Sequence, residues 1–365
     1  MKFISLVFCV ITLTQTTSFK VSSLCRPRLY TLANTQIPDP NASLNEQPTL
    51  LSYFNKGINK VKAGFKNLFI INLANKKGIP WKEYYNLGAT NMDILLQNYN
   101  EINNPYIVYP DYYTKSFHLY DEGNLNWEAA LEAVPATFLI ATNYLRENFT
   151  TTIQNHVLNY KTDSSFKNTG RIMDIGCSVG ASTKFLIKAF PDKEVDAIDL
   201  SPHFLSAAKF HHSTPSSPLF TDMHNKITYH HVMAEKMPFE SNSYDIVSLS
   251  YIIHELPTKI TEEVIAEVFR VLRPGGTLSI TDLIGGDMVL NKYLFELSEP
   301  YIQQYYNTDF IKIISEAGFI FITKGDNTRN RIWTASKPEN SPKKTLKNMT
   351  ELEQQQLWDE IHQYH

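Results

Sequence analysis

The chain has 365 residues, 43% of them hydrophobic and 19% charged, and a formal net charge of -3. A chain of this composition can bury a large core in one or two domains, which excludes intrinsic disorder, and its small net charge excludes a chain-wide basic surface for nucleic acid. No apolar run reaches the ~18 to 20 residues that span a bilayer, so the sequence predicts a soluble or membrane-surface protein.

The first 38 residues predict two targeting segments in tandem. An apolar run from Phe3 to Leu13 leads into small residues that end near Ser18, which is the pattern of a signal peptide. Residues 19–38 combine basic residues, serines and threonines with no acidic residue, which is typical of a transit peptide. The pair resembles the bipartite presequence of algae with secondary plastids, although no alanine stands at the expected cleavage site after Ser18.

The positions of the cysteines favour a plastid over the secretory pathway. Cys9 and Cys25 lie inside the leader, so a mature chain keeps only Cys177 and has no intrachain disulfide. Removal of residues 1–38 also leaves an acidic chain with a net charge of -7. We expect a plastid protein, and the alternatives are another organelle or the secretory pathway.

Residues 39–165 are expected to form a helical, aromatic-rich extension that precedes the main domain. Its clearest element is a helix over residues 48–74, in which apolar residues recur at spacings of three and four. Lysines between Lys56 and Lys66 fall off this stripe, which gives a basic amphipathic helix suited to peripheral contact with an anionic membrane surface. The alternative is that the helix packs over the main domain with its lysines in solvent.

Residues 166–337 predict a Rossmann-like α/β domain with a seven-stranded, mostly parallel sheet. Short β-branched apolar runs alternate there with helical patterns, as in successive βα units. The segment between the last two strands is too short for a crossover helix, which predicts an antiparallel hairpin at one edge. Residues 338–365 are expected to form a polar linker and a short helix. The expected strands are Arg171 to Ile175, Glu194 to Asp199, Lys226 to Val232, Tyr244 to Ser250, Thr277 to Asp282, Phe319 to Lys324 and Arg331 to Ala335.

The first of these strands runs into a turn of small residues and then into a helix. Gly176 and Gly180 allow a sharp turn and a close backbone approach to a ligand, and the helix start presents free N–H groups. The spacing is not Gly-x-Gly-x-x-Gly, so this turn alone is a weak signal. Asp199 at the end of the second strand strengthens it, because a carboxylate there can accept both hydroxyls of a ribose.

Two further motifs complete the pattern, one from Ala234 to Val247 and one from Glu267 to Leu278 with an Arg-Pro-Gly-Gly turn. Together the four motifs make the region from Asn168 to Lys337 resemble class I S-adenosylmethionine-dependent methyltransferases of the type 11-like group, which includes quinone and small-molecule methylating enzymes. An aromatic run from Tyr112 to Ala130 resembles a stretch that precedes the domain in uncharacterised plant chloroplast and cyanobacterial methyltransferases.

This resemblance implies a site for S-adenosylmethionine beside a site for a methyl acceptor. The loop of Asp174, Gly176, Ser178 and Gly180 receives the methionine part of the cofactor, and Asp199 binds its ribose. The resemblance places Ala234 and Glu235 beside the adenine. It places Ser250 and Tyr251 at the floor between cofactor and acceptor.

Three positions depart from the family pattern. Ser178 stands where the middle glycine is usual, Ala197 replaces a common glycine, and Met233 takes the usual place of an adenine-binding aspartate. These departures leave weak or altered cofactor binding open. Asp174 and Asp199 also have an alternative role as carboxylates that only cap turns.

Methyl transfer from a sulfonium needs alignment and exclusion of water more than acid–base groups. A neutral histidine can still remove the proton of an acceptor hydroxyl, and His254, just after the fourth strand, is the candidate base. The alternative is that His254 starts a helix and only shapes the pocket. The residues after His254 do not form His-Glu-x-x-His, and the sequence gives no metal-binding motif.

Aromatic side chains can form a lid over the positive sulfonium, and an ordinary packed aromatic cluster is the alternative. The candidates are Tyr113, His118, Tyr120, Trp127 and Tyr251.

We therefore expect methyl transfer from S-adenosylmethionine to a small molecule such as a plastid prenylquinone or another apolar or phenolic metabolite. One rival keeps the fold and binds NAD(P), against which the missing Gly-x-Gly-x-x-Gly counts. A second rival is a degenerate, membrane-associated binding protein without activity. Nucleic acid is not an expected partner.

Overall fold

The computed structural model describes residues 70–115, 120, 123–160, 170–284, 299–327 and 329–339. The chain divides into two units between Leu73 and Ala74, and the elements described below belong to the second unit apart from the first residues of α3. Several predictions lie outside the described residues. They are the two targeting segments, all but the end of the 48–74 helix, His118, and the helix after residue 340.

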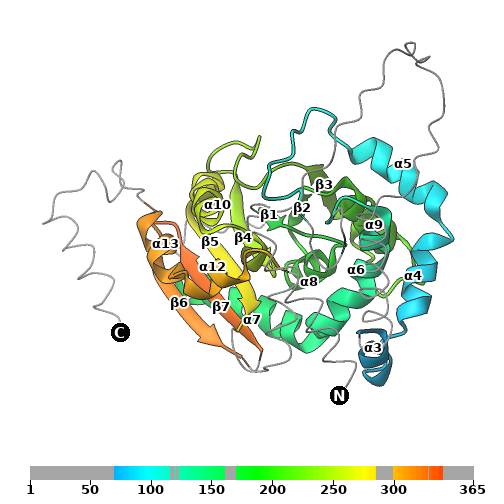
Figure 1. The fold of residues 1–365 in the computed structure, drawn as a ribbon. Helices are drawn as coiled ribbons and strands as arrows, with labels where there is room; N and C mark the ends of the chain where they lie inside the picture. Colours follow the sequence, from blue (N-terminus) through cyan, green and yellow to red (C-terminus); the bar gives the residue numbers. More distant parts are fainter. Residues whose placement is uncertain are drawn as a thin grey trace, which may run out of the picture. The chain divides into compact units, whose positions relative to one another are not determined.

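The sheet confirms the predicted fold class. Its seven strands follow the order β3-β2-β1-β4-β5-β7-β6, and β1 to β5 are parallel (Figure 1). The expected βα units are therefore present on both sides of β1. The strand bounds are β1 Arg171–Ile175, β2 Glu194–Asp199, β3 Ile227–His231, β4 Tyr244–Ser250, β5 Leu272–Leu283, β6 Ile320–Asp326 and β7 Asn330–Ser336.

The last two strands form the predicted antiparallel hairpin at one edge. β7 lies between β5 and β6, with Trp333 opposite Ile280 on β5 and opposite Lys324 on β6. β5 begins five residues before the expected Thr277, because Leu272 pairs with Tyr244 of β4 and Lys337, directly after β7, supplies partners for the glycine turn. The N–H of Gly275 donates to the carbonyl of Lys337 at 2.8 Å, and the N–H of Lys337 donates to the carbonyl of Gly276 at 2.8 Å.

Helices cover both faces of the sheet, as a parallel sheet requires. Alternate residues of β1 point to opposite faces. Ile172 packs with Phe149 and Ile153 of α7, and Met173 belongs to the cluster that includes Val264 of α10. The sheet is therefore buried between α7 with α8 and α10 with α13. The helix bounds on these faces are α7 Asn143–Tyr160, α8 Ala181–Ala189, α9 Pro202–Ser213, α10 Thr258–Val271, α12 Ile302–Asn307 and α13 Phe310–Glu316.

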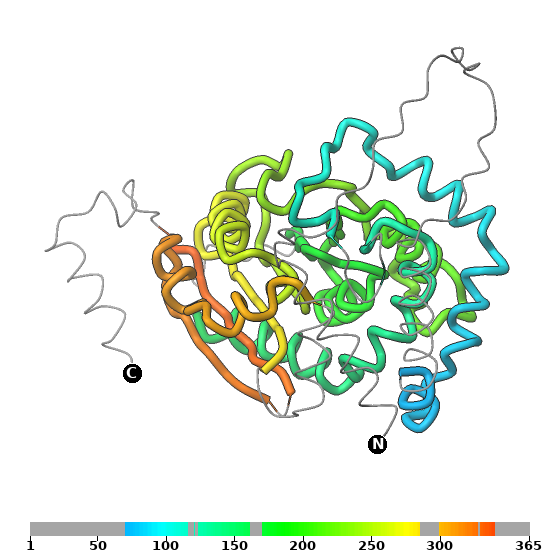
Figure 2. Tube along the Cα trace, viewed as in Figure 1, coloured from blue at the N-terminus to red at the C-terminus, as the bar shows by residue number. Residues whose placement is uncertain are grey.

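The described part of the N-terminal extension is helical. α5 and α6 pack against α9, so the extension lies beside the β2 and β3 side of the sheet (Figure 1). The tube in Figure 2 shows residues 103–115 leaving α5 as an irregular loop that runs toward the sheet. No helix in the described residues is long and apolar enough to cross a membrane. The extension contains α3 Asn72–Lys76, α4 Trp81–Ala89, α5 Met92–Ile102 and α6 Trp127–Ile140.

Candidate active site

The candidate site lies where the strand order changes direction. β1 pairs with β2 on one side and with β4 on the other, so the chain segments that follow these strands diverge at their carboxyl ends. Open α/β sheets bind ligands in the crevice that this divergence leaves. The sequence places Asp174, Asp199 and Ser250 in the last two positions of the three strands.

The turn after β1 is held in a left-handed conformation at three positions. Gly176, Ser178 and Gly180 have φ of 65°, 49° and 81°. A Cβ atom on Gly180 would lie 2.4 Å from the Cε1 atom of His212, so only glycine fits there. Ser178 adopts its unfavourable φ without being glycine, and its N–H donates to Asp199 Oδ2 at 2.9 Å. The serine in place of the usual glycine therefore keeps the turn.

Asp174 has one oxygen that is used by the fold and one that is not. Its Oδ2 accepts hydrogen bonds from the hydroxyls of Ser182 and Thr183, both at 2.7 Å, which ties β1 to the start of α8. Its Oδ1 is buried and has no hydrogen-bond partner. Burial raises the pKa of Asp174 to about 6, against the two hydroxyls and the charge of Arg146. The turn-capping role thus uses one oxygen of the carboxylate and leaves the other without a partner.

Asp199 joins the turn after β1 to the start of α9. Besides the bond from Ser178, its Oδ1 accepts the N–H of Ser201 at 2.8 Å. Burial raises the pKa of Asp199 to about 6 despite these backbone N–H groups, and the charge of Glu255 adds to the increase. Each carboxylate oxygen accepts one of these bonds and keeps a lone pair for a further donor.

The segment expected beside an adenine is tied to the loop 103–115. Tyr112 donates its hydroxyl proton to Glu235 Oε1 at 2.7 Å, and both Glu235 and Ala234 are half-buried. Tyr109 contacts His231, at the end of β3, with 3.2 Å between the hydroxyl oxygen and Nε2. This loop therefore closes one side of the site, as a lid would.

The aromatic lid candidates separate in the structure. Tyr113 lies on the 103–115 loop and stacks on Tyr109 with ring centroids 6.2 Å apart. Burial raises the pKa of Tyr113 well above its ordinary value, and the charges of Asp199 and Glu255 add to the increase.

Two other candidates take part in packing. Trp127 begins α6 and packs edge-on against His203 with centroids 4.8 Å apart. Tyr120 donates to Glu132 and packs against the cluster formed by α4, α6 and α9. Neither residue is brought next to Asp199 by a described contact, and both match the packed-cluster alternative.

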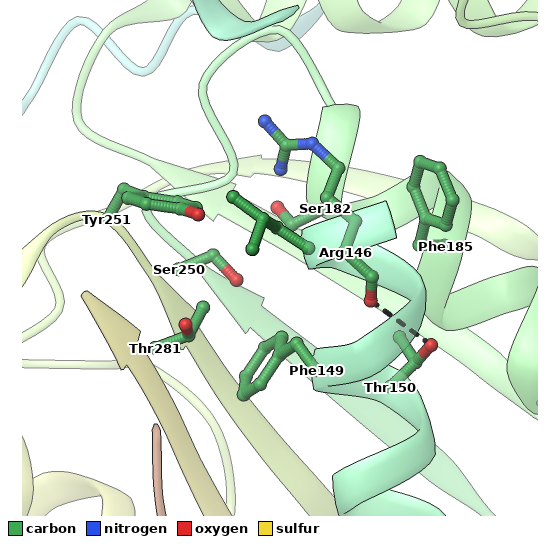
Figure 3. Close-up of a pocket in the computed structure, with 9 residues that line it drawn as sticks. Arg146, Phe149, Thr150, Ser182, Phe185, Ser250, Tyr251 and Thr281 are labelled. Atoms are coloured by element: carbon green, nitrogen blue, oxygen red, sulfur yellow. Dashed lines mark hydrogen bonds between the residues drawn. The ribbon is translucent and has the colours of Figure 1, made fainter. Parts of the chain in front are cut away.

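The end of β4 carries a second backbone outlier. Tyr251 has a φ of 58°, and its N–H donates to the carbonyl of Thr281 at 2.8 Å. The Oγ of the preceding Ser250 is buried without a hydrogen-bond partner. Figure 3 shows Ser250 and Tyr251 on one side of a small pocket, opposite side chains of α7 and α8. Ser250 and Tyr251 therefore line this pocket, and strain of this kind often marks a functional site.

His254 is held by a carboxylate that the sequence analysis did not single out. Its Nδ1 lies 2.7 Å from Oδ1 of Asp282, at the end of β5, and its backbone N–H donates to Oδ2 of the same residue at 3.2 Å. Both residues are buried. Burial alone lowers the pKa of His254, but the charges of Asp282, Glu255 and Glu299 outweigh it and raise the pKa to about 9.

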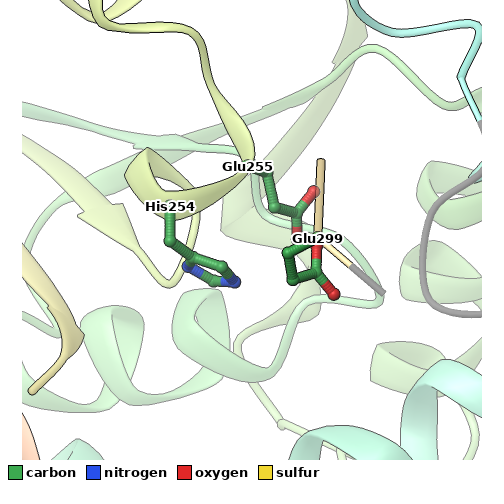
Figure 4. A group of neighbouring side chains, drawn as sticks. All are labelled: His254, Glu255 and Glu299. Atoms are coloured by element: carbon green, nitrogen blue, oxygen red, sulfur yellow. The ribbon is translucent and has the colours of Figure 1, made fainter. Parts of the chain in front are cut away.

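Glu255 and Glu299 complete a polar wall around this imidazole. The ligand-type atoms of His254, Glu255 and Glu299 lie within 4.8 Å of one another, and Figure 4 shows the imidazole facing the two carboxylates. Asn124 Nδ2 donates to Glu255 Oε2 at 3.4 Å. Because Asp282 occupies Nδ1, the Nε2 atom is the nitrogen left for an acceptor. His254 is the middle residue of a short helical turn, Ile253–Glu255, one position after the helix start that the alternative predicted.

A scan against family models matches residues 172–276 to a methyltransferase domain. An uncharacterised methyltransferase of Synechocystis sp. is 28% identical over 161 residues, which cover 42% of this chain and 68% of that protein. A demethylmenaquinone methyltransferase of Lactococcus lactis is 28% identical over 146 residues, which cover 40% of this chain and 54% of that protein. The similarity is therefore centred on the α/β domain and reaches only part of each chain.

Among solved structures, a phosphoethanolamine N-methyltransferase 2 of Haemonchus contortus in complex with S-adenosylmethionine superposes with a TM-score of 0.45 and 16% identity. The superposition covers 65% of this chain and 61% of that one.

The site residues fit the cofactor of this family. Asp174 Oδ1 is a buried acceptor without a donor, which suits the ammonium group of S-adenosylmethionine. Asp199, fixed by two backbone N–H groups, keeps lone pairs for two ribose hydroxyls. The chain therefore carries a class I S-adenosylmethionine-dependent methyltransferase domain.

Proposed function

We propose that this protein methylates a small phenolic or hydroquinone-type acceptor, of the prenylquinone class, with His254 as the base. The observation that carries the proposal is the buried pair of His254 and Asp282, which lies at the same sheet edge as Asp174 and Asp199. Demethylmenaquinone methyltransferases and a polyprenyl-benzoquinol methylase are among the relatives, and their names support this acceptor class.

S-adenosylmethionine, when bound, supplies the electrophilic methyl group. The chain itself orients the acceptor and moves one proton. Asp282 fixes His254 Nδ1, so Nε2 takes the proton of the acceptor hydroxyl. The resulting phenolate is more nucleophilic at its oxygen and at its ring carbons, so the same base serves methylation at either atom.

The loop of residues 103–115 excludes water from this reaction. Tyr112 and Tyr109 tie it to Glu235 and His231, and Tyr113 stacks on Tyr109. A dry site strengthens the electrostatic contacts of the acceptor and protects the sulfonium from side reactions.

Calorimetric titration of the purified full chain with S-adenosylmethionine, S-adenosylhomocysteine and NADH tests the cofactor, with Asp199→Ala as the matched variant. We expect the wild-type chain to bind the two adenosyl ligands and Asp199→Ala to lose this binding. Turnover is then measured with ubiquinol-, menaquinol- and simple phenol-type acceptors by mass spectrometry. Binding of NADH alone would make the protein a dehydrogenase. Binding of adenosyl ligands with no turnover on any acceptor would favour a binding protein.

We further propose that the protein works in a plastid. The support is the tandem leader of residues 1–38, with its apolar run followed by a basic segment free of acidic residues. Fusion of residues 1–38 to a fluorescent protein in an alga with secondary plastids tests this, with residues 19–38 alone as the matched control. We expect the full leader to reach the plastid and the shorter one to stay in the cytosol. Secretion of the full-leader fusion would contradict the proposal.

A further inference from the structure

Arg146 is a buried cation in the α7 helix, outside the matched methyltransferase segment of residues 172–276. Its side chain is 6% exposed. Its Nη2 donates to the hydroxyl of Thr137 at 2.5 Å, and its Nε is buried with no hydrogen-bond partner. No carboxylate in the described ranges forms an ion pair with it. A buried guanidinium left in this state is costly, so its place calls for an anionic ligand.

The surroundings of Arg146 form a pocket that is suited to a carboxylate. Figure 3 shows Arg146 at the pocket with Ser182 of α8 and with Ser250 and Tyr251 at the end of β4. Ser250 Oγ is buried and has no hydrogen-bond partner. The guanidinium carbon lies 5.8 Å from the centroid of the Tyr251 ring. This contact uses none of the guanidinium N–H donors, so the donors not bonded to Thr137 remain for a ligand.

A buried carboxylate is linked to this pocket through Ser182. Ser182 lines the pocket and also donates to Asp174, whose other oxygen has no hydrogen-bond partner. Asp174 and Arg146 attract each other but do not pair directly. A carboxylate oxygen and a guanidinium Nε that are both buried without a hydrogen-bond partner are complementary to a zwitterion, in which an ammonium and a carboxylate sit on one carbon.

We infer that Arg146 binds the α-carboxylate of the methionine part of S-adenosylmethionine, and that Asp174 Oδ1 accepts from the α-ammonium. The inference rests on the cofactor named in the proposed function. It places a cofactor-specificity residue on α7, which precedes the matched methyltransferase segment. A carboxylate of the methyl acceptor has the same chemistry, but it would leave Asp174 Oδ1 without a donor.

The test compares three adenosine-based ligands that carry successively less of the amino acid end, the last of them being a neutral thioether. They are S-adenosylmethionine, its decarboxylated form, which keeps the amine, and methylthioadenosine, which lacks both groups. Dissociation constants are measured by calorimetry on the full chain, on Arg146→Met and on Arg146→Lys. Lys188→Met, an exposed charge on α8, is the matched control.

We expect the wild-type chain to prefer S-adenosylmethionine over its decarboxylated form. Arg146→Met should lower the affinity for S-adenosylmethionine by about 10- to 100-fold, which is the value of charge-assisted hydrogen bonds. The affinities for the other two ligands should stay within about twofold of wild type. Arg146→Lys should recover part of the loss, and Lys188→Met should match wild type.

An equal loss of affinity for all three ligands in Arg146→Met would overturn the inference, because a purely structural role of Arg146 predicts that result. Unchanged binding of S-adenosylmethionine, with a raised KM for a carboxylated acceptor, would assign the pocket to the acceptor instead. If Arg146→Met fails to fold, the wild-type comparison still decides, since equal affinity for the first two ligands rejects a carboxylate contact. A wild-type chain that binds none of the three ligands would reject the cofactor itself.

Discussion

Asp282 Oδ1 lies 2.7 Å from Nδ1 of His254, so a buried carboxylate at the end of β5 fixes an imidazole that follows β4. These residues are far apart in the sequence and meet only because β4 and β5 are neighbouring strands. A carboxylate in this position fixes the tautomer of the ring and raises the basicity of its other nitrogen.

Substitution of His254 by asparagine should lower kcat/KM by about 10²- to 10⁴-fold, because the acceptor loses its base. The pKa of His254 is raised to about 9, so the imidazole is mostly protonated at neutral pH and its active neutral form grows as the pH rises. We therefore expect kcat/KM of the wild-type chain to rise about tenfold per pH unit and to level off near pH 9.

His254→Asn should show no such rise, and its affinity for S-adenosylhomocysteine should match wild type. An unchanged pH profile in this variant would remove His254 from the mechanism. Initial rates from pH 6 to 10 at several acceptor concentrations supply the measurement.

Asp282→Asn should lower kcat more than it raises KM, because Asp282 positions the base and does not touch the acceptor. Loss of its charge should also lower the pKa of His254 and move the pH at which the rate levels off to lower values. A rate loss with an unshifted profile would mean that Asp282 only stabilises the fold. Asp309→Asn, which alters a carboxylate at the start of α13, is a control for removal of a structural charge.

Asp174→Asn should make the protein more stable and a poorer cofactor binder. The pKa of Asp174 is raised to about 6 in the folded chain, above its ordinary value of 3.8, so the folded state favours the protonated form. Its contribution to stability is complete below about pH 4 and is lost as the pH rises through 6. We expect the variant to gain about 1 to 3 kcal/mol at pH 7.

The gain from Asp174→Asn should shrink toward zero below pH 4, and the affinity for S-adenosylmethionine should fall at least about tenfold. Urea unfolding at pH 4 and pH 7 with calorimetric titration measures both effects. A variant that is less stable at pH 7 would show that the hydroxyls of Ser182 and Thr183 need the full negative charge.

Gly180→Ala should disrupt the turn after β1 for two separable reasons. The φ of 81° costs an L residue about 1 to 2 kcal/mol, and the new Cβ would meet the ring of His212 at 2.4 Å. His212 Nε2 lies 2.8 Å from the carbonyl of Gly180, so the ring also holds this turn.

The double variant with His212→Ala relieves the steric clash but not the strain of φ. We expect it to be more stable than Gly180→Ala alone and still to bind S-adenosylhomocysteine worse than His212→Ala. Equal affinity of the double variant and His212→Ala would show that the left-handed turn is not needed for binding. Thermal melts and titrations of the three variants decide this.

The sheet was predictable because its signals are local. The run from Tyr244 to Ser250 contains the β-branched pair Ile246 and Val247 and follows turn residues, and every residue of β4 is buried. The start of β5 was misplaced for a non-local reason. Gly275 and Gly276 look like a turn in the sequence, and the strand extends through them because Lys337, directly after β7, provides hydrogen-bond partners.

The site was predictable where a motif surrounds it. Asp174 and Asp199 stand at fixed places beside a glycine turn, whereas Arg146 lies in a helix that has no motif and meets the site only through packing of α7. Asp282 could have been predicted from the sequence, although no motif surrounds it. A carboxylate at the end of a strand such as Thr277 to Asp282 lies at the same edge as the ends of β1 and β4, and the same rule that singled out His254 covers it.

The position of β7 sets the order in which this domain can be completed during synthesis. The ribosome releases β5 long before Asn330–Ser336, so a nascent chain carries β5 with an open edge while β7 is still missing. Open edges of apolar strands recruit other chains, and multistep folding lengthens the exposure. The final hairpin therefore covers the open edge of β5. A chain that ends before residue 330 should aggregate rather than form a smaller folded domain.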